Sequence, residues 1–225
     1  MARSPRRESA PGAKSLILSG SKGGCGRSSC ARNLLIAAAL DGIDVVGIDL
    51  DPQGTLSRWG ERRQKAKLKL PQIVVPNIIH AEVSNLGAIE AAATGHQLAI
   101  IDTAPSVEEH MRAMISLCAR AALVLIPTSP THDDLESVAP WSVTLKQGGA
   151  KTVFLLNRAN RRTKSFESAR SKLLKVGSLA PLEIPALEDM HLPHVNGLAA
   201  VDYERNKAGS AMQDLWTYVR QEVAL

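Results

Sequence analysis

The feature that most constrains the fold is an alternation of short apolar runs with longer amphipathic stretches at helical spacing. Continuous runs of Val, Ile and Leu indicate strands buried on both faces, and helices between such strands are typical of a parallel α/β sheet. We therefore predict a doubly wound, mostly parallel sheet. The expected strands are 15–18, 45–49, 73–75, 98–102, 121–126, 152–157 and 182–185. The expected helices are 28–41, 54–67, 82–94, 106–119, 132–147, 163–175 and 209–223.

Two of the expected helices begin with a pattern typical of an N-cap. Ser106 precedes Glu109 by three residues, and Thr131 precedes Asp134 in the same way. No internal repeat interrupts the alternation, and 225 residues is a length compatible with one large domain. We predict a flexible basic tail over 1–13 and one domain over 14–225.

The composition excludes several classes of protein. Apolar residues make up 44% of the chain and charged residues 22%, which is typical of a globular protein. The longest apolar run, 34–40, is far too short to span a bilayer, and the last amphipathic stretch is not cationic enough for a membrane anchor. The N-terminus lacks the apolar segment of a secretory signal, and three scattered cysteines fit reduced thiols. We expect a cytoplasmic protein without a membrane partner.

Positive charge is concentrated in three stretches. Eight basic residues and one acidic residue occupy 151–175, six and one occupy 58–69, and four and one occupy 1–14. Clustered cations on an otherwise acidic chain indicate a polyanion-binding face, although solvated helix faces have the same composition. Because only seven aromatic residues are present, contacts to nucleic acid are expected at phosphates rather than at stacked bases.

A glycine-rich segment follows the first expected strand. Residues 19–29 read Ser-Gly-Ser-Lys-Gly-Gly-Cys-Gly-Arg-Ser-Ser and lead into the first expected helix. Glycines at such a turn let successive N–H groups point inward, and the helix N-terminus adds a partial positive charge. The segment therefore predicts a phosphate cradle. It departs from the usual P-loop pattern at Ser21, in place of a glycine, and at Arg27, in place of a lysine.

Three motifs in this order resemble a known family. Residues 22–28, Lys-Gly-Gly-Cys-Gly-Arg-Ser, resemble the deviant Walker A motif of the ParA/MinD ATPases. Ile-Asp-Leu-Asp-Pro-Gln-Gly at 48–54 and Ile-Ile-Asp-Thr-Ala-Pro at 100–105 follow at strand ends, as in that family. Leu-Ile-Pro-Thr-Ser-Pro at 125–130 is similar to the short, ParF-like ParA proteins. The resemblance implies a P-loop NTPase fold that binds ATP or ADP with Mg²⁺.

The resemblance also implies roles for single residues. Asp51 would activate water, Lys22 would reach the phosphates bound by a second subunit, and Arg27 would take the place of the catalytic lysine. Mg²⁺ would be held by Ser28 and Asp102, with Asp49 as a metal-side or structural carboxylate. The nucleotide would contact Gly23, Gly24, Cys25, Gly26, Arg27, Ser28, Ser29, Asn157, Pro185 and Ala186.

Arg27 is the most consequential departure from the family pattern. A lysine is a compact point charge, whereas arginine is a broad planar fork in the same turn. Because positive charge is kept and geometry is not, we expect nucleotide binding with either slow hydrolysis or a shifted phosphate position.

ParA-type proteins bind DNA non-specifically as ATP-bound dimers, and the resemblance places such contacts on basic residues near the C-terminal part. Phosphate contacts of this kind are salt-dependent and ignore sequence. In contrast, the loop at 184–191 is acidic here, and the basic run at 58–69 could instead meet an acidic partner protein. The candidate DNA-binding residues are Arg158, Arg161, Arg162, Lys164, Arg170, Lys172, Lys175, Arg205 and Lys207.

The resemblance favours a nucleoid-associated partition ATPase that forms a nucleotide-dependent homodimer and segregates a plasmid or other replicon. Its partner would be a centromere-binding or cargo adaptor protein. One alternative is an ATPase of the same family that positions another cargo. A second alternative, based on Arg27, is a nucleotide-gated binding protein that does not hydrolyse ATP.

Overall fold

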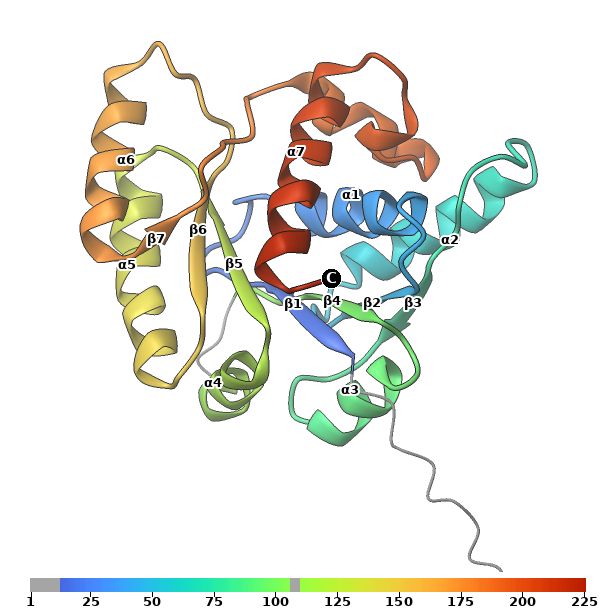
Figure 1. Cartoon of the computed structure of the whole chain (residues 1–225), viewed down its shortest axis with the longest axis horizontal. Helices are drawn as coiled ribbons and strands as arrows, with labels where there is room; N and C mark the ends of the chain where they lie inside the picture. The colour runs from blue at the N-terminus through green and yellow to red at the C-terminus, as the bar shows by residue number, and fades with distance from the viewer. Residues whose placement is uncertain (1–12, 106–109) are drawn as a thin grey trace, which may run out of the picture.

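A computed structural model describes residues 13–105 and 110–225, which build one seven-stranded sheet (Figure 1). Its order is β3-β2-β4-β1-β5-β6-β7, and all pairs are parallel. The expected parallel α/β architecture is therefore confirmed. The strands are β1 (Lys14–Leu18), β2 (Val45–Asp49), β3 (Asn77–His80), β4 (Leu98–Asp102), β5 (Leu123–Thr128), β6 (Thr152–Leu156) and β7 (Ser178–Leu179).

Helices cover both faces of the sheet. The core on one face is built by α1, α2 and α7 against the strands, and the core on the other by α3, α4, α5 and α6. The helices are α1 (Arg27–Leu40), α2 (Thr55–Lys67), α3 (Leu86–Ala93), α4 (Met111–Arg120), α5 (His132–Gln147), α6 (Lys164–Val176) and α7 (Lys207–Glu222). Three short 3₁₀ helices, η1 (Glu188–Met190), η2 (Leu192–Asn196) and η3 (Ala200–Asp202), precede α7. No described helix is long and apolar enough to cross a membrane.

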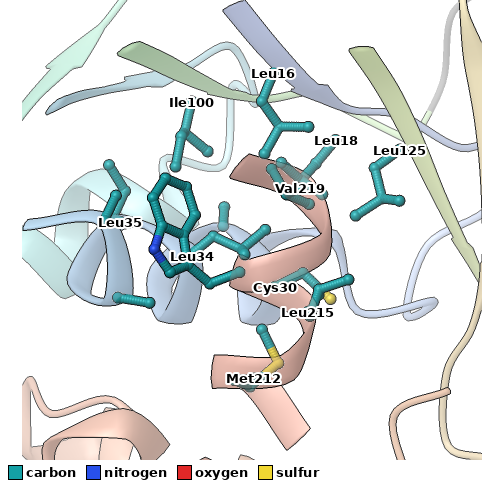
Figure 2. Close-up of a cluster of buried hydrophobic side chains, with 14 of the residues drawn as sticks. Leu16, Leu18, Cys30, Leu34, Leu35, Ile100, Leu125, Met212, Leu215 and Val219 are labelled. Atoms are coloured by element: carbon teal, nitrogen blue, oxygen red, sulfur yellow. The ribbon is translucent and has the colours of Figure 1, made fainter. Parts of the chain in front are cut away.

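The strand sequences explain why both faces are covered. Leu16 and Leu18 of β1 point into the core beneath α1 and α7, whereas Ile17 between them points into the opposite core. Successive side chains of a strand alternate between the two faces, so a strand buried on both sides reads as a continuous apolar run. Figure 2 shows Leu215 and Val219 of α7 packed with the strand side chains of the first core.

The third strand lies four residues later than the sequence predicts. The expected strand at 73–75 does not form, because its carbonyl groups are bound by side chains of α2. Arg63 Nε donates to Val74 O at 2.6 Å, and Lys67 Nζ donates to Ile73 O at 2.7 Å. Pro76 has no N–H to offer the sheet, and pairing with β2 starts at Asn77.

The last strand is also displaced. The strand expected at 182–185 is replaced by the two-residue β7 at 178–179. The chain continues beside β6 with isolated hydrogen bonds, from Ala180 N to Phe154 O at 2.8 Å and from Ile184 N to Leu156 O at 2.9 Å. Prolines at 181 and 185 break the ladder because they lack the donor that it needs.

The predicted helices correspond to α1–α7, with differences at their starts. Helix α3 begins at Leu86 rather than at 82, because the Asn85 side chain accepts from Ala88 N and caps it. Thr131 is at the N-cap of α5 as predicted, but its side chain makes no capping hydrogen bond; Asp133 and Asp134 complement the helix dipole instead. The expected cap at Ser106 and the tail residues 1–12 lie outside the described residues.

Candidate functional site

The glycine-rich loop and the two aspartate motifs converge at the carboxyl ends of three strands. Leu18, the last residue of β1, pairs with Asp102 at the end of β4, and Asp102 also pairs with Asp49 at the end of β2. The carboxyl ends of parallel strands are where α/β sheets bind ligands. The topology therefore brings motifs from residues 19–29, 48–54 and 100–105 to one edge.

The loop from Ser19 to Gly26 has the backbone of an anion cradle. Gly24 and Gly26 have φ of 78° and 98°, in the left-handed region that favours glycine. Gly26 is also the N-cap of α1, and no side chain caps this helix. The free N–H groups of the first turn thus face the loop, which is the arrangement that binds phosphate at a helix N-terminus.

Arg27 is folded beneath the loop. Its side chain is buried, with 6% exposed, and donates from Nε to Thr103 O at 3.0 Å. Its Nη1 donates to Gly20 O at 3.0 Å and to Lys22 O at 2.6 Å. The guanidinium therefore ties the loop to the segment after β4 through main-chain carbonyls. Contact between Arg27 and a phosphate stays a prediction.

Asp102 is a buried carboxylate without a hydrogen-bond partner among the described residues. Burial raises its pKa to about 7, and the nearby charges of Asp49 and Asp51 add to the rise. The Ser28 hydroxyl and the Arg27 guanidinium lie near enough to moderate it, although neither carboxylate oxygen is within hydrogen-bonding geometry. Orphaned buried carboxylates are costly, and they point to a missing cation or water.

The other two aspartates hold their own loop. Asp49 accepts from Asp51 N at 3.1 Å with one oxygen and from Ser57 N at 2.8 Å with the other. Asp51 accepts from Gln53 N at 2.8 Å and is partly exposed. Asp49 is thus a structural carboxylate in this conformation, whereas Asp51 borders the site.

The donor set fits a magnesium nucleotide rather than a protein-only metal site. Within the described ranges, no cluster of three or more His, Cys, Asp or Glu could hold a metal by itself. Magnesium is typically bound by one or two carboxylates together with phosphates and water. Ser28, in the first turn of α1, and the orphaned Asp102 are the residues that would hold it.

Lys22 is exposed, and it is tied to α5 of its own chain. Its Nζ donates to Asp133 O at 2.7 Å, and the neighbouring Ser21 hydroxyl is hydrogen-bonded to Ser137. The first part of the loop therefore rests on α5, while Arg27 holds it from below.

Three of the residues expected to contact the nucleotide, Asn157, Pro185 and Ala186, meet at the end of β6. Asn157 Nδ2 donates to Cys25 O at 2.7 Å, and a Cβ on Gly26 would lie 2.1 Å from the same nitrogen. The segment after β7 lies against the loop after β6: Pro185 forms an isolated β-bridge with Ala159, and Ala186 N donates to Ala159 O at 3.2 Å. The structure thus brings these residues beside the loop, and their contact with a nucleotide stays a prediction.

The candidate DNA-binding residues fall into two groups. The first group, from Arg158 to Lys175, lies in the loop after β6 and on the exposed side of α6. Within the loop, Arg161 is paired with Glu183. Arg205 and Lys207 are exposed at the start of α7, a separate element from α6 (Figure 1). All nine side chains are exposed, which phosphate contact requires.

Arg32 is a charged residue near the site that the motifs do not indicate. It lies one helical turn after Ser28 and is buried, which lowers its pKa to about 10; Asp102 partly offsets this effect. Helical side chains lean toward the N-terminus, so Arg32 leans toward the metal side of α1. The signal in the sequence is a single cation within the stretch 30–40, whose only other polar residue is Asn33.

Comparisons with known proteins agree with this geometry. Residues 16–196 match the family described as the CobQ/CobB/MinD/ParA nucleotide binding domain. The maintenance of carboxysome distribution protein A of Gloeobacter kilaueensis is 33% identical over 121 residues, 53% of this chain and only half of that protein's length.

Solved structures share the fold. The septum site-determining protein MinD of Pyrococcus horikoshii, complexed with Mg-ADP, has a TM-score of 0.69 at 21% identity, covering 92% of this chain and 95% of that one. A ParA family ATPase of Chlorobium tepidum has a TM-score of 0.70 at 16% identity, covering 92% and 99%. Because the family match spans most of the chain and all three motifs lie at one sheet edge, the chain belongs to the CobQ/CobB/MinD/ParA family of nucleotide-binding domains, whose ParA and MinD members are deviant Walker A ATPases.

Proposed function

We propose that this chain is an ATP-dependent switch that positions a cargo within the cell, using DNA as its support. The observation that carries the nucleotide part is the orphaned Asp102 beside Ser28 at the uncapped start of α1. The cargo part is supported by the relative that is named for carboxysome distribution. Since only half of that relative is matched, its particular cargo is not transferred to this chain.

Magnesium, when bound, would supply positive charge that offsets the negative charge of the ATP phosphates. The chain's own residues position and shield that charge. N–H groups from Gly23 to Ser28 would bind phosphate oxygens, and Ser28 and Asp102 would hold the metal. Asp51, at the rim of the site, orients the attacking water.

Lys22 supplies the link between nucleotide and dimer. Its bond to Asp133 O is on the exposed surface, so exchanging it for the phosphates of a second subunit costs little. A cation from each subunit at the same triphosphate would neutralise its charge in a site from which water is excluded. ATP therefore favours a homodimer, and hydrolysis releases it.

The exposed cations of the β6–α6 region would hold the dimer on DNA without sequence preference. Contacts to phosphates release counterions, so the affinity falls steeply as salt rises. The expected localisation is the cytoplasm, on the nucleoid, with an adaptor protein that links the switch to its cargo.

Segregation of a plasmid or replicon is the second candidate. It uses the same cycle and is favoured by the similarity of residues 125–130 to ParA proteins. The two differ in the adaptor, which for segregation is a centromere-binding protein.

Arg27 favours a third candidate, a nucleotide-gated protein without turnover. Its guanidinium donates to three main-chain carbonyls, from Thr103, Gly20 and Lys22. Leaving them for a phosphate breaks buried and partly buried hydrogen bonds, each worth about 1.5 to 3 kcal/mol because the donor is charged. This cost slows hydrolysis or prevents it.

ATP turnover tests these candidates. Purified protein is assayed with Mg²⁺, with and without duplex DNA, beside Arg27→Lys, Asp51→Ala and the exposed control Arg112→Lys. We expect slow turnover that Asp51→Ala abolishes, that Arg27→Lys raises by about tenfold or more, and that Arg112→Lys leaves unchanged.

Two outcomes would change the proposal. ATP binding without turnover in the native chain, together with turnover in Arg27→Lys, supports the nucleotide-gated protein. Failure of both proteins to bind ATP removes the switch altogether.

A further inference from the structure

A groove of about 320 Å³ lies between α2 and the segment around η2. Helix α2 is on the opposite side of the molecule from α6 in Figure 1, so the groove is separate from the cations of α6. None of its eight lining residues is acidic. They are Arg62, Lys65, Ala66, Lys69, Leu70, Val195, Asn196 and Leu198.

The walls of the groove are held by buried contacts. Arg62 Nε donates to His194 O at 3.3 Å. Gly197, with φ of 75°, lies so close to α2 that a Cβ there would meet the backbone of Arg62 at 2.5 Å. The neighbouring Arg63 donates to Gly197 O at 3.1 Å and to both oxygens of Asp202. The hollow is therefore preformed, which lowers the entropic cost of binding.

The groove combines apolar surface with cations in an arrangement that a monomer leaves uncovered. Val195 is 64% exposed, and Leu192, three residues earlier in η2 and outside the groove lining, is 58% exposed. Lys65, in the last turn of α2, and Lys69, in the turn that follows this helix, are exposed beside them, and no ion pair neutralises either among the described residues. Exposed apolar side chains with a polar rim are typical of protein interaction sites.

We propose that this groove binds an acidic segment of a partner protein in which apolar side chains at helical spacing are interspersed with carboxylates. Carboxylates pair with Arg62, Lys65 and Lys69, and apolar side chains cover Val195 and Leu198. A DNA backbone satisfies the cations but brings no apolar group to the hollow, so a peptide fits both halves of the surface. The inference goes beyond the nucleotide switch, because the groove is formed without nucleotide.

A fluorescein-labelled 16-residue peptide tests the proposal, with leucines at helical spacing between glutamates. Fluorescence anisotropy is measured with the full chain without nucleotide. Controls are the same peptide with lysine for glutamate, a polyglutamate of equal charge and a 20-bp DNA duplex. We expect the leucine–glutamate peptide to bind at least about fivefold more tightly than either peptide control.

Variants locate the binding. Lys65→Glu and Lys69→Glu should each weaken the leucine–glutamate peptide at least about fivefold, and Val195→Ser should weaken it about threefold. Arg112→Glu, an equal charge reversal on α4, should leave binding unchanged. Circular dichroism verifies that each variant is folded.

Three results would overturn the proposal. Equal binding of polyglutamate shows plain charge attraction, and unchanged binding by all groove variants places the peptide elsewhere. Loss of duplex binding in Lys65→Glu without loss of peptide binding makes the groove a DNA contact. None of these results alters the turnover assay, so the groove and the switch fail separately.

Discussion

Three buried charged side chains, Asp102, Arg27 and Arg63, are accommodated in different ways. Arg27 donates hydrogen bonds to main-chain carbonyl groups, and Arg63 forms an ion pair with Asp202 at 2.7 Å. Asp102 has neither kind of partner among the described residues. Because an uncompensated buried charge opposes folding, Asp102 is the residue at which ligand binding and stability conflict.

Replacing Asp102 with asparagine should change the pH dependence of stability. The folded pKa of about 7 exceeds the ordinary value of 3.8, so between these values the native state holds a proton that the unfolded state has lost. The free energy of unfolding therefore falls as pH rises from about 4 to about 7 and then levels off. Asp102→Asn removes this slope and is more stable at pH 8 by an amount on the order of 4 kcal/mol, since each pKa unit corresponds to about 1.4 kcal/mol.

Urea unfolding in EDTA, without nucleotide, measures this difference at pH 4.5, 6 and 8. The gap between Asp102→Asn and the native chain should shrink toward pH 4.5. A gap that is the same at all three values contradicts the assigned pKa. Asp214→Asn, at an exposed carboxylate of α7 that forms no ion pair among the described residues, is the matched control.

At the scale of elements, periodicity predicts those strands whose pairing depends on apolar burial alone. Residues 98–102 and 45–49 are examples, since every side chain there is buried. The strand at 77–80 could not be predicted from the apolar pattern. Its position depends on Arg63 and Lys67 of α2, which donate hydrogen bonds to the carbonyl groups just before it, and nothing in the sequence of a helix indicates such contacts.

The candidate site likewise contains positions that the sequence predicts and a side-chain conformation that it does not. The positions of Gly26 and Asp102 follow from motif and topology, because Gly26 is the N-cap of α1 and Asp102 is the last residue of β4. The inward fold of Arg27 does not, since it depends on carbonyls that only the tertiary structure brings together.

Arg63 joins α2 to the 3₁₀ segments, and its loss should destabilise the protein strongly. It is fully buried, donates to both oxygens of Asp202 at 2.7 and 2.8 Å, and lies 5.4 Å from the Trp59 ring centroid. Arg63→Ala leaves Asp202 as a buried unpaired carboxylate, so we expect a loss of about 3–5 kcal/mol. Thermal and urea unfolding measure it.

The double variant Arg63→Ala with Asp202→Ala separates the pair from the packing. It should cost less than the sum of the two single variants because no charge is left unpaired. Strict additivity would mean that the ion pair contributes nothing.

At the scale of the whole molecule, one sheet joins two cores, so both should unfold together. Trp59 and Trp216 are in the core with α1 and α7, whereas Trp141 is in the other. Leu215→Ala, in the first core, should cost about 2–5 kcal/mol and shift the fluorescence and circular dichroism transitions by the same amount. Two separated transitions would contradict a single domain over 14–225.

One amide spans the distance between the glycine-rich loop and the cationic segment. Asn157 donates to Cys25 O at 2.7 Å and accepts from Arg158 N at 2.9 Å through its other atom. A displacement of the loop must therefore either carry the backbone of Arg158 with it or break a buried hydrogen bond. The Asn157 side chain thus couples the position of the loop after β1 to that of the loop after β6.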